Sequence, residues 1–229
     1  MSLLGKLRGL AFHVSHRLVP RSKGEHEFAY WKRRVATEGT LSNDHYVRFY
    51  TGQFGLTFDD YAAKRVLDIG CGPRGSLEWA SMTLERVGLD PLADQYAALR
   101  TEPHAMTYVA SGSEQIPFAD GHFDVVSSFN SLDHVDDLDA TIREIGRVVK
   151  TGGLFLLLTD VDHDPTPAEP IEFSFDIVER FTPPFELVEQ HHYEKRGRGM
   201  YDSVEQAIAY DHSNPTRRYG ILAAKFRRA

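Results

Sequence analysis

The chain has 229 residues and a net charge of −7, with 41% hydrophobic and 26% charged residues. This length is enough for one sizeable hydrophobic core, and the composition is usual for a globular domain rather than a disordered chain. No apolar run approaches the roughly 20 residues of a membrane-spanning helix. Because the chain is acidic overall, we expect no nucleic-acid partner.

The first 24 residues contain five lysines or arginines and no acidic residue. Apolar side chains recur at the spacing of one helical face, at Leu3, Leu7, Leu10, Val14 and Leu18. This pattern predicts a basic amphipathic helix over residues 3–18. The helix either packs on the rest of the protein or contacts an anionic membrane surface. A cleaved presequence is a third interpretation, although a secretory signal would have a continuous apolar core.

Residues 24–61 are rich in aromatic side chains. We predict a helix from Glu27 to Glu38, broken at Gly39, and a second helix that begins near residues 42–44 and runs to about Tyr50. An ordinary helical cap with an aromatic core explains these features.

Residues 65–75 read Arg-Val-Leu-Asp-Ile-Gly-Cys-Gly-Pro-Arg-Gly. An apolar strand that ends in Gly-x-Gly-x-x-Gly receives nucleotide-sized ligands at the carboxyl end of a parallel sheet. By spacing alone, a dinucleotide is one candidate ligand. Asp68 favours another, because a carboxylate two residues before the first glycine would repel a pyrophosphate. S-adenosylmethionine (SAM) has no phosphate, and its sulfonium and amine cations suit an acid.

This segment resembles the first motif of the class I SAM-dependent methyltransferases, hydrophobic-Leu-Asp-hydrophobic-Gly-Cys-Gly, matched from Val66 to Gly72. The resemblance implies a doubly wound α/β fold with a seven-stranded, mostly parallel Rossmann-like sheet and a C-terminal antiparallel hairpin. It implies SAM as the cofactor, bound in part by Asp68, Gly70, Cys71 and Gly72. We therefore divide the chain into an N-terminal helical cap, residues 1–61, and a SAM-binding domain, residues 62–229.

A crossover helix is predicted from Ser76 to Leu84, and a second strand from Arg86 to Asp90. Asp90 lies 20 residues beyond Gly70, the spacing of an acid that accepts hydrogen bonds from ribose hydroxyls. Alternatively, Asp90 caps a helix that opens at Pro91. The two roles of Asp90 are compatible. We take Asp90 and Pro91 as candidates for contact with the cofactor.

After a third strand, Met106 to Ala110, the segment Ser111 to Phe118 resembles the part of the same family that edges the adenine. Ser113 and Glu114 are the candidates there. Many members carry Asp where Gly112 stands, so this chain lacks that side-chain contact to the adenine. A surface-loop role is the alternative for Glu114.

A fourth strand, Asp124 to Phe129, leads into Asn130 and Ser131, which the resemblance places beside the cofactor. His134 matches a histidine that family members often carry here. If the acceptor is a hydroxyl, His134 is the first candidate for the general base, since imidazole titrates near neutrality. Alternatively, His134 only packs in the loop or orients it.

The rest of the chain predicts a helix from Leu138 to Lys150, a strand over residues 154–159, and two strands over residues 185–195 and 218–226, joined by a polar loop. Asp133 and Asp160, with residues 162–164, could form an oxygen-rich metal site. The resemblance to the methyltransferases of this fold that bind magnesium here is partial, since Val161 stands where they carry an amide side chain and no lysine closely follows Asp133. We therefore expect no metal.

By resemblance, the helical cap closes over the cofactor and makes His45, Tyr46 and Tyr50 acceptor-side candidates. We expect methyl transfer from SAM to a small-molecule acceptor by in-line displacement, with O- or N-methylation favoured. The alternatives are an NAD-type oxidoreductase and a SAM-binding scaffold without catalysis. The single cysteine, Cys71, forms no internal disulfide and fits a cytoplasmic protein, with peripheral membrane contact through residues 3–18.

Overall fold

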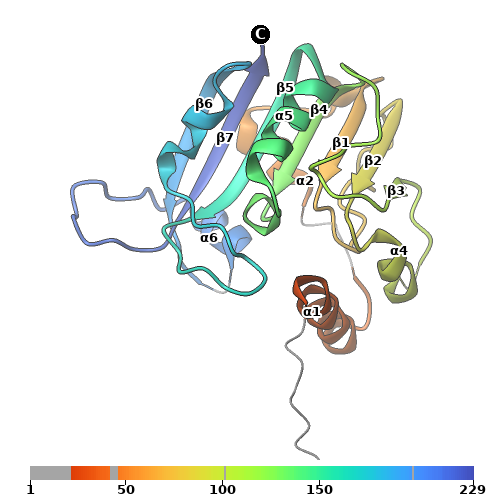
Figure 1. Cartoon of the computed structure of the whole chain (residues 1–229), viewed down its shortest axis with the longest axis horizontal. Coiled ribbons are helices and arrows are strands. Elements are labelled where there is room, and N and C mark those ends of the chain that lie inside the picture. The colour runs from red at the N-terminus through yellow and green to blue at the C-terminus, as the bar shows by residue number, and fades with distance from the viewer. Residues whose placement is uncertain (1–21, 42–45, 101, 198) are drawn as a thin grey trace, which may run out of the picture.

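The computed structural model describes residues 22–41, 46–100, 102–197 and 199–229. They form one seven-stranded sheet in the order β3-β2-β1-β4-β5-β7-β6 (Figure 1). The strands are β1 (Arg65–Ile69), β2 (Glu85–Leu89), β3 (Thr107–Val109), β4 (Phe123–Phe129), β5 (Val149–Val161), β6 (Phe185–Glu194) and β7 (Gly220–Arg228). β1 to β5 are parallel, and β7 lies antiparallel between β5 and β6. The predicted fold class is confirmed. The predicted helix over residues 3–18 and His45 lie outside the described residues.

The described helices lie on both faces and at one end of the sheet. They are α1 (Lys23–Glu38), α2 (Val47–Tyr50), α3 (Phe58–Tyr61), α4 (Ala93–Tyr96), α5 (Leu138–Val148) and α6 (Met200–Gln206), with the 3-10 helices η1 (Gly52–Phe54), η2 (Ala97–Leu99), η3 (Leu132–His134) and η4 (Phe175–Phe181). None of them is long and apolar enough to cross a membrane.

β5 is covered by a hydrophobic core on both faces, which explains the continuous apolar run in its sequence. Phe155 and Leu157 face the core that includes α5, whereas Leu156 and Leu158 face the core that includes α2 and α6. Successive side chains of a strand point to opposite faces, so a strand covered on both sides is apolar throughout. The predicted helix before β5 ends at Val148, two residues earlier than expected.

The predicted crossover helix from Ser76 to Leu84 is wrong, because this segment consists of turns. The guanidinium of Arg86 donates to the carbonyl oxygens of Leu77 (3.3 Å) and Glu78 (2.7 Å). A helix would need these two carbonyls for its own N–H groups. The ring of Trp79 also packs 5.0 Å from that of Tyr61. These tertiary contacts outweigh the local helix propensity.

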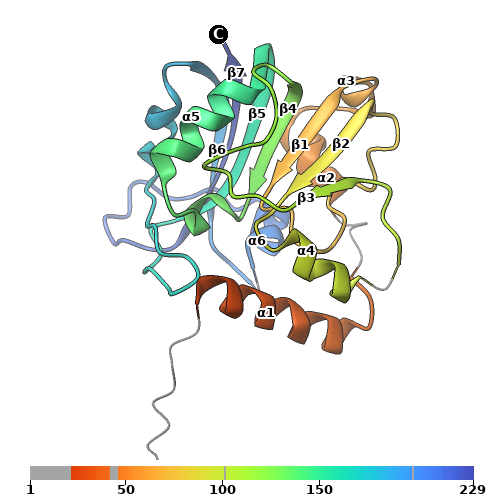
Figure 2. The same ribbon diagram turned by 45° about the vertical axis from the view of Figure 1, so that its right-hand side comes forward.

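α1 lies across the end of the sheet toward which β1, β2 and β4 point (Figure 2). It begins four residues before the predicted start, because Ser22 and Glu25 form a capping box. The helix ends at Gly39, as predicted, where φ is 78°. None of its residues is buried, so α1 covers this end of the sheet without belonging to the core.

The connection between β6 and β7 contains a short helix, α6, where the sequence predicted a polar loop only. Met200 and Val204 of α6 are buried in the same core as α2. This brings a segment near the C-terminus to the end of the sheet that α1 covers (Figure 2).

Candidate functional site

Two cavities lie at the carboxyl ends of the central strands. The smaller, about 240 Å³, has apolar walls from Ile69, Leu89, Leu92 and Val135. The larger, about 870 Å³, extends toward α6 and the loop around residues 166–169. Five residues line both cavities: Glu27, Gly70, Asp90, Asn130 and His134. The two cavities therefore meet beneath α1.

The glycine loop is held by its own backbone. Gly70 has φ of 69°, and a Cβ there would lie 2.2 Å from the Cβ of Ser131, so only glycine fits. The N–H groups of Gly70 and Cys71 donate to the carbonyl oxygen of Leu89 at 2.8 and 3.4 Å. The N–H of Gly72 donates to Asp90 Oδ2 at 3.1 Å. Since these N–H groups are engaged and no helix follows, the loop lacks the anion site that a dinucleotide needs.

Cys71 is buried in this loop, and burial raises the pKa of its thiol well above the usual range. A thiol in this state is a poor nucleophile. Its side chain fills space beside Gly88, where an added Cβ would lie 2.6 Å from Cys71 Sγ. Cys71 therefore packs within the loop, and it also lines the larger cavity, so its cofactor-side role stays a prediction.

Asp68 lies at the base of the larger cavity and is 3% exposed. Its carboxylate accepts hydrogen bonds from the hydroxyls of Tyr50 (3.0 Å), Ser127 (2.6 Å) and Ser76. Burial raises the pKa of Asp68 to about 6, although these three hydroxyls act in the opposite direction. Asp68 thus lies in a site where a nearby cation would stabilise its charged form.

Asp90 lies where the two cavities meet. Its Oδ1 accepts from the N–H of Leu92 at 2.8 Å, and its Oδ2 from Gly72. Burial raises the pKa of Asp90 to about 6, and the negative charge of Glu27 acts in the same direction. Asp90 therefore orders the turn before α4, which begins at Ala93 rather than at Pro91, and still presents its carboxylate to the cavities.

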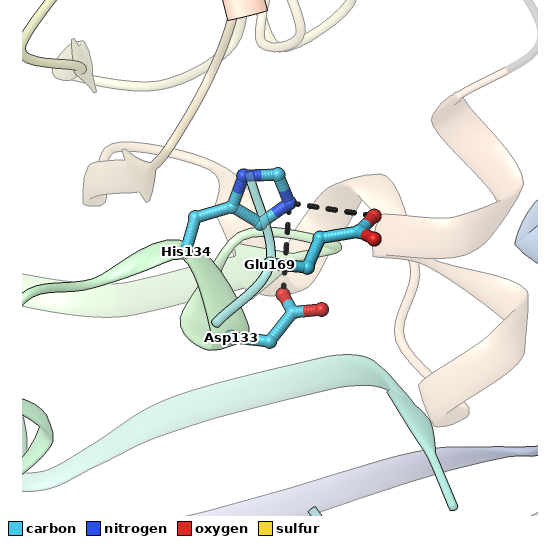
Figure 3. Close-up of side chains that lie close together, drawn as sticks. All are labelled: Asp133, His134 and Glu169. Atoms are coloured by element: carbon cyan, nitrogen blue, oxygen red, sulfur yellow. Dashed lines mark ion pairs between the residues drawn. The ribbon is translucent and has the colours of Figure 1, made fainter. Parts of the chain in front are cut away.

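His134 lies between three carboxylates. Its Nε2 is 3.8 Å from Asp133 Oδ1 and 3.8 Å from Glu169 Oε1 (Figure 3). Its Nδ1 is 3.9 Å from Glu27 Oε2. One ligand-type atom each from Asp133, His134 and Glu169 lie within 4.8 Å of one another, a spacing that could hold a metal ion.

Of the metal group considered from the sequence, Asp133 and His163 lie close together, whereas Asp160 pairs with Lys195. Asp160 accepts from Lys195 Nζ at 3.0 Å and from the Tyr219 hydroxyl at 2.8 Å. Asp133 Oδ2 lies 3.4 Å from His163 Nε2. The adjacent Asp133 carboxylate is the main reason that the pKa of His163 is raised to about 9. Each of the two aspartates therefore has a cationic partner.

The remaining predicted residues divide between the cavities. Pro91, Ser113, Glu114 and Ser131 line the smaller one, and Tyr46 and Tyr50 line the larger one. Three of these side chains also form hydrogen bonds within the protein and so have a structural role as well. Glu114 Oε1 accepts from the N–H of Asp136 at 2.8 Å, Ser113 Oγ lies 2.9 Å from Thr141 Oγ1, and Ser131 Oγ donates to the carbonyl of Ile69.

Many residues that line the larger cavity were not site candidates from the sequence, among them Glu27 and Trp31 of α1, Glu169 of the loop after β5, and Tyr201 of α6. The aromatic density of residues 24–61 pointed to a cap, but not to these side chains. No local motif marks Glu169 or Tyr201, because they reach the cavity through the tertiary fold.

Residues 67–157 match a family described as a methyltransferase domain. A malonyl-[acyl-carrier protein] O-methyltransferase of Enterobacter lignolyticus is 36% identical over 42% of this chain and 38% of that protein. A ubiquinone/menaquinone biosynthesis C-methyltransferase of Pseudomonas putida is 31% identical over 64% of this chain and 62% of its own length. The chain thus spans less than two thirds of these relatives.

Among solved structures, the [4+2]-cyclase SpnF is similar, with a TM-score of 0.55, 20% identity, and coverage of 73% of this chain and 75% of that one. This likeness concerns the fold alone. Together, the sheet order, the glycine loop and the family match define a Rossmann-like domain that uses SAM as its cofactor. Residues 67–157 are similar to the methyltransferase domain family, and the relatives of the chain named above are methyltransferases.

Proposed function

We propose that this protein transfers a methyl group from SAM to a small-molecule acceptor by in-line displacement, with an oxygen or nitrogen acceptor favoured. One observation carries the proposal: two buried carboxylates, Asp68 and Asp90, face a cavity whose glycine-loop N–H groups are already engaged. Such a site suits a cationic ligand without phosphate. This disfavours the NAD-type oxidoreductase.

The residues fit the parts of SAM. The apolar slot formed by Ile69, Leu89 and Val135 suits a flat adenine, and Asp90 at the junction suits the ribose hydroxyls. Asp68 and the loop from Gly70 to Gly72 would hold the amino-acid end. When bound, SAM supplies a methyl group made electrophilic by its sulfonium, so the protein chiefly has to align the acceptor and exclude water.

The acceptor would enter the larger cavity, which Tyr46 and Tyr50 line. Tyr46 is buried, and burial raises the pKa of its hydroxyl to about 12, so Tyr46 stays neutral and acts as a hydrogen-bonding group. We propose His134 as the base where the acceptor must lose a proton, and no metal. His134 lines both cavities, which places its imidazole near the junction.

The cofactor assignment is tested by calorimetry with SAM. Asp90→Ala and Asp68→Ala should each weaken SAM binding about ten- to hundredfold, because each removes a charge-assisted hydrogen bond of roughly 1.5–3 kcal/mol. NAD should not bind to the unmodified protein. Unchanged SAM affinity in both variants would remove these residues from the cofactor site.

A SAM-binding scaffold without catalysis remains the second candidate, because the same loop and the same acids would bind the cofactor whether or not a methyl group is transferred. Transfer of a labelled methyl group from SAM, screened over metabolite fractions, separates the two. Binding of SAM without transfer to any fraction would favour the scaffold.

A further inference from the structure

Glu27 lies in the second turn of α1, where the two cavities meet. Glu27 lines both of them. Its Oε1 accepts a hydrogen bond from Trp31 Nε1 at 2.8 Å, and its Oε2 lies 3.9 Å from His134 Nδ1. The side chain is 28% exposed. Its carboxylate is thus held in a fixed direction by one oxygen while the other faces the junction.

α1 has an ion pair at each end, and these pairs set the position of Glu27 while the helix covers the cavities. At the first turn, Lys23 Nζ donates to the carbonyl oxygen of His134 at 2.6 Å and pairs with Asp136. At the last turn, both carboxylate oxygens of Glu38 accept from Arg74 at 2.7 and 2.8 Å. Between them, the indole of Trp31 covers the glycine loop, where a Cβ on Gly72 would lie 3.1 Å from the ring.

The junction has an excess of negative charge. Glu27 and Asp90 both face it, and His134 is the one basic side chain among the five described residues that the cavities share. Lys23 also borders the smaller cavity, but it pairs with Asp136. The charge of Glu27 also contributes to the raised pKa of Asp90. A ligand that brings a positive charge to the junction would relieve this repulsion.

We infer that Glu27 is a cofactor-selecting residue, whose charge favours binding of the sulfonium form, SAM, over its neutral thioether product, S-adenosylhomocysteine. The inference rests on the proposed function. The two ligands differ by the methyl group and by one positive charge at sulfur, while adenine, ribose and the amino-acid end are shared. Contacts to the shared parts affect both ligands alike, so a charge at the junction is what separates them. α1 is then part of the binding site as well as its cover.

The test is calorimetry of both ligands with the full chain and with Glu27→Gln. Glutamine keeps an oxygen that accepts from Trp31 but removes the charge. SAM affinity should fall about five- to twentyfold, and S-adenosylhomocysteine affinity less than about twofold, as expected for a partly exposed charge pair. Since α1 has no buried residue, the thermal midpoint of the free protein should not change, and this is checked in the same preparation.

Two matched variants complete the design. Glu186→Gln removes the same charge from an exposed position of β6 and should leave both affinities unchanged. Trp31→Phe keeps the charge of Glu27 but removes the indole donor that fixes the direction of its carboxylate, so it should weaken SAM more than S-adenosylhomocysteine, by a smaller factor than Glu27→Gln does. An equal loss for both ligands in Glu27→Gln, or no loss, would overturn the inference and leave Glu27 as part of the cover. If the unmodified protein binds neither ligand, the proposed function itself fails.

Discussion

Asp68 has a buried carboxylate that is surrounded by the hydroxyls of Tyr50, Ser76 and Ser127. Its pKa is about 6 in the folded protein against an ordinary value of 3.8. A group whose pKa is raised by folding binds its proton more tightly in the folded state. Its contribution to stability is therefore present below about pH 4 and is lost as the pH rises through about 6.

We predict that Asp68→Asn removes this pH dependence in the protein without SAM. Between pH 4 and pH 7, the free energy of unfolding of the unmodified protein should fall relative to that of the variant, by at most about 3 kcal/mol. Urea denaturation at four or five pH values measures the difference. The same variant should also bind SAM more weakly. Asp68 would then favour cofactor binding while its ionised form lowers the stability of the protein without SAM. A difference that does not vary with pH would contradict the prediction.

His134 provides a second prediction at this scale. If the acceptor must lose a proton, His134→Ala should lower turnover by roughly 10²- to 10⁴-fold while SAM affinity stays nearly unchanged. Labelled-methyl transfer and calorimetry measure the two quantities. Full turnover in the variant would limit His134 to orienting the loop.

We further predict that dialysis against a chelator leaves methyl transfer unchanged, because the proposed reaction uses no metal. Adding back divalent ions after dialysis serves as the control. Loss of activity that a divalent ion restores would contradict this and would point to Asp133, His134 and Glu169, whose ligand-type atoms lie close together (Figure 3).

At the scale of elements, α1 differs from the rest of the structure. Its contacts with the rest of the protein include ion pairs at its ends and rings along one side, such as Phe28, whose ring centroid lies 6.2 Å from that of Tyr96 of α4. Elements with few buried contacts open at low free-energy cost. α1 can therefore leave the cavities without unfolding the sheet.

Accordingly, Lys23→Ala should speed SAM dissociation several-fold and leave the thermal midpoint of the free protein nearly unchanged. The lost contact ties the first turn of α1 to the carbonyl of His134, so the variant helix opens more often. Stopped-flow fluorescence of Trp31, with Trp79→Phe as the background, measures the rate. A fall in thermal midpoint without a change in dissociation would show that this contact serves the fold instead.

At the scale of the whole molecule, the strand order explains where the site lies. β1 lies between β2 and β4, where the direction of the strand order reverses, and ligands bind in the crevice that such a reversal opens. Residues 47–61 before β1 pack into the core of the sheet, through Phe49, Phe54 and Tyr61. The division into residues 1–61 and 62–229 stays a prediction.

The N-terminal basic segment also concerns the whole molecule, because the net charge is −7 whereas residues 1–24 carry five lysines or arginines and no acidic residue. We predict that the full chain partitions onto anionic lipid vesicles and that a chain lacking residues 1–21 does not. Sedimentation with anionic and neutral vesicles measures this, and high salt should weaken it. Equal partitioning of the two chains would make the segment a structural one.

The amino-acid sequence by itself determined the strands of the sheet, the glycine loop and the acids Asp68 and Asp90. These follow from short-range patterns: continuous apolar runs, glycines that the turn requires, and an acid at a fixed distance after the loop. The segment after the loop could not be predicted this way, since Arg86 takes the carbonyls that a helix would need. Glu27, Glu169 and Tyr201 join the site only because the fold brings α1, the loop after β5 and α6 to one end of the sheet. Their roles depend on distances between remote segments, which no local pattern encodes.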